Sequence, residues 1–425
     1  MNILKEEANK CLMCKNPRCR QNCPINTPIP EVIKLFKVNK LYKAGEILFN
    51  NNPLSLICSI VCPHENQCRG NCIRGIKGDP IEFYEIEEYI SKAFLYNAEF
   101  KQNSSLNYRI AIVGSGPAGI TIAFLLALKG YKITIFESQE KIGGVLRYGI
   151  PEFRLSKEIL DKIQEKLISL GVKIRPNTLV GPVITIDKLF EDGYKAIFLG
   201  TGVWNPKTLN IKGETLGNAH YAIDYLKAPD VYNLGKKVVV IGAGNVAMDA
   251  ARTAKKNGVN EVTILYRKGF EEMTATKFEI EEAKEEGIKF ELFKSPLGIL
   301  DDGVKYIETK KTAYENGENV IKTEGKEGFI QSDSIIIAVS QSPKNNIVVN
   351  NKGFETNKNG LLITDELGHT TREGVFASGD VVTGAKTVVK AVNHAKIVAN
   401  SIHNFCKNKK WAYKCVQYFL CSLKW

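Results

Sequence analysis

The chain has 425 residues, 44% of them hydrophobic and 24% charged, a composition typical of a globular protein with two to four domains. Its formal net charge is +12, but the lysines are scattered and form no dense basic block, so we expect no nucleic-acid partner. The first residues lack the features of a signal peptide, and no apolar run approaches the ~20 residues that span a bilayer. We therefore expect a cytoplasmic protein that does not bind a membrane.

Eight cysteines lie in two tight groups near the start of the chain. Their spacing is C-x2-C-x4-C-x3-C-P over residues 11–24 and C-x3-C-P-x4-C-x3-C over residues 58–72. In a reducing cytosol, clustered cysteines favour metal ligation over disulfides. The run that ends in Cys-Pro is nearer to ferredoxin-type sequences than to zinc knuckles. The pattern predicts two iron–sulfur clusters, with a zinc site and disulfides as the alternatives.

Two later segments repeat one pattern after a helix-like region that ends near residue 106. They cover residues 109–137 and 237–267, and each runs as a strand, a glycine-rich turn, a helix and a second strand. Parallel strands joined by a helix build a doubly wound α/β domain. The repeat predicts two Rossmann-like nucleotide-binding domains.

The turn of the first repeat is G-S-G-P-A-G at residues 114–119. Its glycines permit a tight turn, a close approach to a pyrophosphate and close packing of helix on strand. An acidic residue at the end of the second strand can accept hydrogen bonds from a ribose. The residues expected at this site are Gly114, Gly116, Pro117, Ala118, Gly119 and Glu137.

The second repeat differs at the corresponding positions. Its second strand ends in Arg267 and Lys268, where a carboxylate would favour NADH, and basic groups there can bind a 2′-phosphate. We predict NADPH at this site, with NADH as the alternative. The turn residues expected to bind it are Gly242, Gly244, Asn245, Val246 and Ala247.

An acidic residue in one nucleotide unit and basic residues in the other predict FAD together with NADPH. Hydride transfer between these two cofactors needs no catalytic side chain. The chain has no cysteine between Cys72 and Cys406, which argues against a redox-active disulfide beside the flavin. We therefore expect electrons to leave the flavin through the N-terminal cysteine clusters.

Seven motifs follow one another in the order found in a known family. The chain resembles the family of the glutamate synthase small subunit, which is shared with the N-terminal half of dihydropyrimidine dehydrogenase and with a subunit of some electron-bifurcating transhydrogenases. The resemblance runs from Cys11 to about residue 405. Its motifs are the cysteine block, GSGPAG, KIGGVLRYGIPEFRL (141–155), FLGTG (198–202), VVVIGAGNVAMDAART (238–253), YRKGFEEMTA (266–275) and ASGDVVTGAKTVVKAV (377–392).

The resemblance implies a division of the chain in which the NADPH domain is inserted in the FAD domain. A helical domain with two 4Fe–4S clusters comes first, and two doubly wound domains follow it. The expected parts are the iron–sulfur domain at 1–106, the FAD domain at 107–209 and 341–405, the NAD(P)H domain at 210–340, and a tail at 406–425.

The resemblance also implies which residues hold the clusters. One cluster would be bound by Cys11, Cys14, Cys19 and Cys72. The second would be bound by Cys23, Cys62, Cys68 and a carboxylate, which falls on Glu87 in this sequence. Cys58 then has no ligand role, and it is the alternative to Glu87.

Further flavin-site residues are implied by the same motifs. They are Gly143, Gly144 and Leu146 along the flavin, Gly379 and Asp380 near the ribityl and pyrophosphate, and Thr387 and Val388 at the isoalloxazine edge. Asn245 and Arg252 would belong to the nicotinamide-nucleotide half. This chain has Arg267-Lys268 where the family usually has two arginines, which weakens a phosphate clamp without removing it.

The function that the resemblance implies is that of an electron-input subunit. Electrons from NADPH would pass through FAD and two 4Fe–4S clusters to a catalytic partner, for which we expect the glutamate synthase large subunit. The alternatives are the electron-input subunit of dihydropyrimidine dehydrogenase and a bifurcating transhydrogenase subunit. Cys58 and the IPEFRL segment favour the dihydropyrimidine dehydrogenase alternative.

Overall fold

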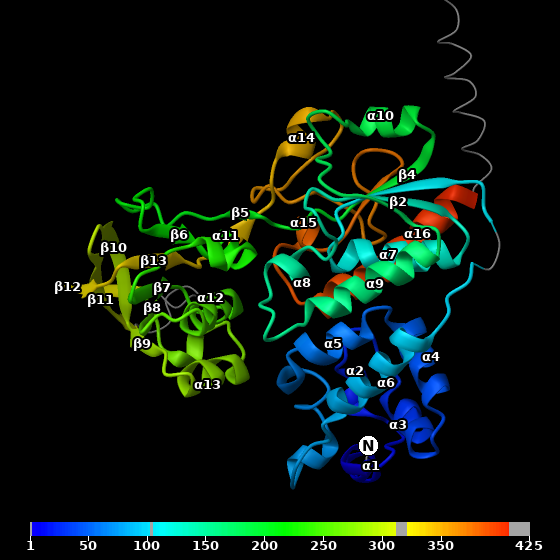
Figure 1. Cartoon of the computed structure of the whole chain (residues 1–425), viewed down its shortest axis with the longest axis horizontal. Helices are drawn as coiled ribbons and strands as arrows, with labels where there is room; N and C mark the ends of the chain where they lie inside the picture. The colour runs from blue at the N-terminus through cyan, green and yellow to red at the C-terminus, as the bar shows by residue number, and fades with distance from the viewer. Residues whose placement is uncertain (1, 103–104, 312–320, 408–425) are drawn as a thin grey trace, which may run out of the picture. The chain divides into compact units, whose positions relative to one another are not determined.

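The computed structural model describes residues 2–102, 105–311 and 321–407 (Figure 1). The chain divides into two compact units. The first comprises Met1–Gly144, Arg154–Val203 and Pro343–Trp425, and the second comprises Val145–Phe153 and Trp204–Ser342. The tail expected at 406–425 lies outside the described residues beyond Lys407.

The N-terminal part of the first unit is helical and packs around its own apolar core. Ile33, Leu48, Ile86 and Ile90 are at most 1% exposed, and they come from three helices. Pro28 and Pro30 lie at the start of α3. A backbone N–H there has no partner within the helix, so proline costs no hydrogen bond. The helices here are α1 (Asn2–Asn9), α2 (Arg18–Gln21), α3 (Ile29–Lys37), α4 (Leu41–Asn51), α5 (Ser55–Val61), η1 (His64–Asn66), η2 (Ile73–Ile76) and α6 (Phe83–Asn97).

A five-stranded parallel sheet forms the centre of the rest of the first unit. Its strand order is β15-β4-β1-β2-β3, so the chain crosses over between neighbouring strands. The central strand, RIAIV, is an almost continuous apolar run, as expected for a parallel strand covered on both faces. The strands are β1 (Arg109–Val113), β2 (Lys132–Phe136), β3 (Lys173–Arg175), β4 (Tyr194–Leu199) and β15 (Val375–Ala377).

Helix α7 (Pro117–Leu128) follows the first glycine-rich turn and is apolar on nearly all sides. A helix of this kind must be buried on every face. It packs along α16 (Val388–Lys407), the long C-terminal helix that also contacts α5 of the helical region. The remaining helices of the first unit are α9 (Lys157–Ser169), α10 (Ile186–Glu191), α14 (Asn346–Asn350) and α15 (Asp380–Thr383).

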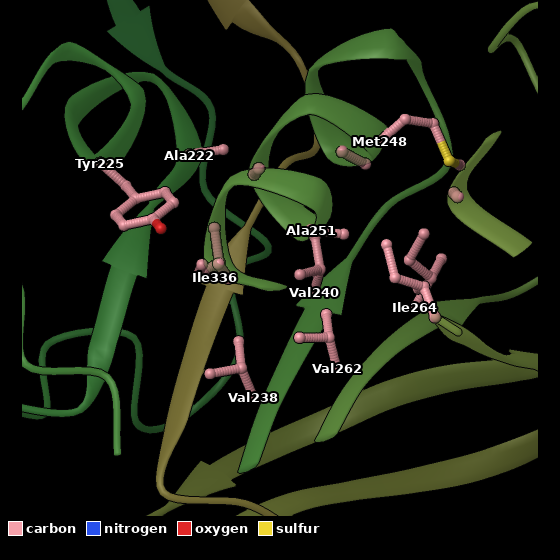
Figure 2. Close-up of a cluster of buried hydrophobic side chains, with 14 of the residues drawn as sticks. Ala222, Tyr225, Val238, Val240, Met248, Ala251, Val262, Ile264 and Ile336 are labelled. Atoms are coloured by element: carbon pink, nitrogen blue, oxygen red, sulfur yellow. The ribbon is translucent and has the colours of Figure 1, made fainter. Parts of the chain in front are cut away.

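The second unit contains a second five-stranded parallel sheet, in the order β6-β13-β7-β8-β9. Figure 2 shows part of its apolar core, in which Val240 and Ile264 of the sheet lie close to Met248 and Ala251 of α12. The strands are β6 (Ala219–Tyr221), β7 (Lys237–Ile241), β8 (Glu261–Tyr266), β9 (Lys289–Leu292) and β13 (Ser334–Ile337). The helices are α8 (Val145–Tyr148), α11 (Ala222–Lys227), η3 (Pro229–Val231), α12 (Asn245–Lys256), η4 (Phe270–Glu272) and α13 (Lys277–Glu285).

Two antiparallel elements complete the second unit. A three-stranded sheet is formed by β10 (Lys294–Leu300), β11 (Gly303–Lys311) and β12 (Ile321–Gln331), and β5 (Asn205–Pro206) pairs with β14 (Gln341–Ser342). The two parallel sheets confirm the predicted α/β class with two doubly wound domains. No helix in the described part of the chain is long and apolar enough to cross a membrane.

Candidate functional site

The first cysteine group surrounds a pocket in the helical region. Cys11 and Cys14 lie in the loop after α1, Cys19 lies on α2, and Cys72 precedes η2. Met13 has a φ of +50°, so the short loop between Cys11 and Cys14 turns tightly. The fold thus brings Cys72 to the three earlier cysteines. The pocket is lined by these four cysteines together with Cys68, Leu12, Pro17, Arg18, Ile29, Pro30, Ile33, Ile73, Arg74, Ile81 and Phe83.

The surroundings of this pocket suit sulfur ligands to a cationic metal centre. Burial raises the pKa of Cys19 to about 11, and burial also raises the pKa of Cys11. A thiolate in this apolar pocket is costly unless a positive charge compensates it, and iron ions supply that charge. None of the described cysteines forms a disulfide. The four residues therefore fit the 4Fe–4S cluster that was predicted for them.

The second cysteine group lies around the start of α6 and the end of α5. Glu87 is on α6 and is 7% exposed, and its carboxyl group lies near the thiols of Cys62 and Cys68. Burial, and then the nearby Cys58 sulfur, raise the pKa of Glu87 well above its usual range. Over the described residues, no hydrogen bond or ion pair reaches this carboxylate. A buried carboxylate beside thiols and without a partner fits a metal ligand.

Cys58, the alternative ligand, is also placed for the second cluster. It is 3% exposed on α5, and Cys62 packs against the small apolar cluster to which Cys58 belongs. Cys23 lies in the same small apolar cluster, which Ile25 and Val389 complete. Both candidates thus lie beside Cys62, and the choice of Glu87 as ligand stays a prediction. Among the described residues, no three His, Cys, Asp or Glu side chains converge closely enough to hold a single metal ion.

The first glycine-rich turn has the shape that a dinucleotide requires. Gly114 has a φ of +92°, and a Cβ on Gly119 would lie 2.1 Å from the carbonyl oxygen of Gly114. A Cβ on Gly116 would meet no atom within 4 Å, so this position faces open space at the start of α7. Pro117 occupies the first turn of that helix, and Ala118 packs against Gly379. The turn therefore leaves room for a pyrophosphate at Gly116.

Glu137 follows β2 and is 4% exposed beside this turn. One carboxylate oxygen accepts hydrogen bonds from Ser115 N at 3.0 Å and from Ser115 Oγ. The other accepts from Ser138 Oγ at 3.2 Å and Gln139 N at 2.9 Å. A ribose hydroxyl would have to replace one of these donors. The role of Ser115 was not predicted, since a serine between two glycines has no signature of its own.

The other flavin residues expected in the first unit lie on two loops and at the start of α16. Gly143 N donates to Ser115 Oγ at 3.2 Å, and a Cβ on Gly144 would lie 2.8 Å from Gly116 Cα. The loop at Gly143 and Gly144 is thus held against the first glycine-rich turn. Leu146, expected along the flavin with them, is fully buried on α8 in the second unit.

Two polar side chains lie at the start of α15 and just before α16, where the flavin is expected. Thr387 Oγ1 is buried and has no hydrogen-bond partner within the described ranges, and Val388 follows it. Burial raises the pKa of Asp380 to about 6, and its carboxylate accepts a hydrogen bond from Lys386 N at 3.2 Å. An unpaired buried hydroxyl is rare, and a bound flavin could supply its partner.

The second glycine-rich turn has the same design in the second unit. Gly242 has a φ of +133°, and a Cβ there would lie 2.4 Å from the carbonyl oxygen of Ala338. Asn245 begins α12, and its Oδ1 accepts a hydrogen bond from Thr276 N at 3.1 Å. Gly244 precedes it at the helix start, while Val246 and Ala247 pack into the core shown in part in Figure 2.

Arg252 forms ion pairs with glutamates on α13 and directly after the end of α13. Its side chain is 6% exposed, and the guanidinium forms ion pairs with Glu279, Glu282 and Glu286. It also lies over the ring of Phe153, 4.9 Å from the centroid. These contacts give Arg252 a structural function in joining α12 to α13, and its contact with a nucleotide stays a prediction.

Arg267 and Lys268 directly follow β8, where the prediction places the 2′-phosphate. Arg267 is exposed and Lys268 is half-buried. In the part of the chain that the structure describes, neither forms an ion pair with a carboxylate. Two basic side chains at the end of this strand are thus available to an anionic ligand.

Comparisons with known proteins match two parts of the chain to family models. The family model described as pyridine nucleotide-disulphide oxidoreductase matches residues 108–395, and the model described as dihydropyrimidine dehydrogenase domain II, 4Fe-4S cluster, matches residues 2–99. The small chain of NADPH-dependent glutamate synthase from Escherichia coli is 32% identical, over 94% of this chain and 91% of that one.

A second relative and a solved structure extend the comparison. The beta subunit of an NADPH-Fe(3+) oxidoreductase from Geobacter sulfurreducens is 31% identical, over 92% of this chain and 64% of its own length. Mycobacterium tuberculosis FprA in complex with NADPH has a TM-score of 0.62 at 18% identity, covering 72% of this chain and 86% of that one. At this identity the solved structure supports the fold alone.

Proposed function

We propose that this chain, which belongs to the family of the glutamate synthase small chain, is an electron-input subunit. It is an oxidoreductase whose cofactors are FAD, NADP(H) and 4Fe–4S clusters. Bound FAD would supply an acceptor for the hydride of NADPH, and bound clusters would supply one-electron transfer to a partner. The chain has no cysteine in the matched range 108–395, so no redox disulfide can take the place of the clusters there.

The observation that carries this proposal is the contact between the second cysteine group and α16. Cys23, Cys62 and Val388 all pack against one small buried cluster that contains Val389, at the start of the helix expected beside the isoalloxazine. We place the second cluster next to the flavin for this reason.

The first cluster then lies on the exit side of the path. Its pocket is bordered by Leu12, which is 61% exposed, and Ile73, which is 39% exposed. A centre near solvent can be approached by another protein, whereas Cys58 and Glu87 of the second group are buried. We therefore propose that electrons reach the second cluster first and leave from the first cluster.

The chain's own residues bind and position the cofactors, since hydride transfer needs no side-chain acid or base. Gly116 admits the FAD pyrophosphate at the start of α7, and Glu137 holds the turn through Ser115. Arg267 and Lys268 bind the 2′-phosphate of NADPH, which gives the preference over NADH.

The partner that we propose is the glutamate synthase large chain. The relatives are named as small or beta subunits, which supports a separate catalytic subunit. Other relatives carry the names of an NADPH-Fe(3+) oxidoreductase and of an NADP(+)-dependent formate dehydrogenase. The iron–sulfur domain match instead favours a dihydropyrimidine dehydrogenase subunit as the second candidate. The cytoplasmic location stays a prediction.

The test of the partner is reconstitution with defined subunits. Mixing the purified chain with a glutamate synthase large chain should give NADPH-dependent glutamate formation, and mixing it with a dihydropyrimidine dehydrogenase catalytic subunit should give no pyrimidine reduction. The reverse pattern would overturn the choice of partner while leaving the function as an electron-input subunit intact.

The ligand of the second cluster can be decided by counting iron in two variants. Glu87→Ala should lower the iron content of the anaerobically purified chain from about eight to about four atoms, because one cluster loses a ligand. Cys58→Ala should retain about eight. Loss of four atoms in the Cys58 variant alone would reverse the assignment. Loss in neither variant would mean that a different group completes the cluster.

A further inference from the structure

A line of hydrogen bonds joins helix α16 to the Cys23 sulfur. Lys396 Nζ lies 2.6 Å from Asn51 O and 3.2 Å from Asn51 Oδ1. Asn51 Nδ2 donates to Thr27 Oγ1 at 3.4 Å, and Thr27 Oγ1 lies 3.3 Å from Cys23 Sγ. The line therefore crosses from the helix expected beside the flavin to a residue expected to bind the second cluster.

The direction of each hydrogen bond in this line follows from chemistry. An ammonium group can only donate, so Asn51 Oδ1 accepts from Lys396. A cysteine thiolate that binds iron has no proton to give, so Thr27 must donate to Cys23 and accept from Asn51. Every bond then points the same way, from the cation toward the sulfur. Hydrogen bonds aligned in this way polarise one another.

Burial lowers the pKa of Lys396, so its ammonium form depends on the groups around it. In the described ranges of the chain, no carboxylate forms an ion pair with Lys396. Asn51 is the last residue of α4, and its carbonyl lies at the negative end of that helix, where a cation is stabilised. Thr27 is 4% exposed, so water does not screen the middle of the line.

We propose that Lys396, acting through Asn51 and Thr27, is a positioning residue that raises the reduction potential of the cluster bound by Cys23. The inference rests on the proposed function, because it requires that cluster to be present. Reduction adds one negative charge to the cluster, and a nearby cation together with an O–H···S hydrogen bond stabilises that charge. The electron from the flavin is then accepted more readily by the cluster nearest to α16.

A redox titration of the anaerobic holoprotein, followed by EPR, tests this inference. Lys396→Met should make reduction of one cluster at least tenfold less favourable, a shift of about 59 mV to lower potential for a one-electron couple. The other cluster should keep its potential. Lys396→Arg retains the charge, so its cluster should keep a potential close to that of the unaltered protein. The matched control is Lys407→Met, an exposed lysine at the far end of the same helix, which should change neither potential.

A second variant keeps the test decisive if Lys396→Met loses iron. Thr27→Val removes only the hydroxyl group at nearly constant volume, and it should shift the same cluster in the same direction. Unchanged potentials in Thr27→Val, or in an iron-replete Lys396→Met, would overturn the inference. An unaltered protein with one cluster or none would instead contradict the proposed function.

Discussion

Replacing Gly116 with valine should remove FAD from the purified chain while leaving the fold of the chain intact. The φ of Gly116 is −69°, which any residue can adopt, and an added Cβ meets no atom within 4 Å. The room that valine would occupy is therefore the room proposed for the FAD pyrophosphate. We expect the FAD content, measured from flavin absorbance after denaturation, to fall at least about tenfold.

Two other glycines serve as controls for this prediction. Gly217→Val places a side chain in open space away from either glycine-rich turn, and it should keep its FAD. Gly119→Ala instead forces a Cβ to within 2.1 Å of Gly114 O, so it should destabilise the turn itself. Stability should be compared with FAD-free unaltered protein, because bound FAD stabilises the fold by mass action. Full FAD occupancy in Gly116→Val would mean that FAD does not approach this turn.

Replacing both Arg267 and Lys268 with alanine should reduce the preference for NADPH over NADH. Charge-assisted hydrogen bonds of this kind contribute about 1.5–3 kcal/mol, so we expect kcat/KM for NADPH to fall roughly tenfold to a hundredfold. The kcat/KM for NADH should change little, since NADH has no 2′-phosphate for these side chains to bind. The measurement is dye reduction under anaerobic conditions with each nucleotide in turn.

The control for this pair is an exposed lysine elsewhere in the second unit. Lys305→Ala, on β11, changes the net charge without altering the end of β8, and it should leave both values unchanged. An equal loss for NADPH and NADH in the double variant would indicate a general effect on binding. Equal efficiencies with the two nucleotides in the unaltered protein would remove the proposed preference altogether.

The features that could be predicted from the sequence are local or strongly patterned. The two glycine-rich turns can be recognised in the sequence because a tight turn between an apolar strand and a helix requires glycine. The gathering of Cys72 with Cys11, Cys14 and Cys19 was also expected, although it came from the resemblance to a family and not from spacing alone. The pattern of a buried parallel strand gave the core of both sheets.

Other features depend on residues far apart in the chain, and no local pattern reveals them. Lys396 and Asn51 are separated by 345 positions, and each is unremarkable in its own segment. The glutamates that hold Arg252 carry a faint signal, since Glu279, Glu282 and Glu286 share one side of a short helical stretch. Their target could not be inferred, because many exposed helices carry acidic residues at this spacing.

The grouping of residues 145–153 with the second unit was likewise not expected. The segment follows Gly144 directly and reads as a continuation of the flavin site. Phe153 instead lies near the charged groups of Arg252 and Lys256, 4.9 and 4.8 Å from its ring centroid. Cation–π contacts of this kind depend on three-dimensional placement, and no local sequence pattern around either partner reveals them.

The central claim, that NADPH electrons pass from FAD into the N-terminal clusters, is tested most directly by one anaerobic titration. NADPH is added stepwise to the purified holoprotein while the flavin absorbance and the EPR spectrum are recorded. The account predicts bleaching of the flavin band together with the appearance of reduced 4Fe–4S signals. Flavin bleaching without any reduced-cluster signal, in a protein shown to contain iron and sulfide, would contradict it.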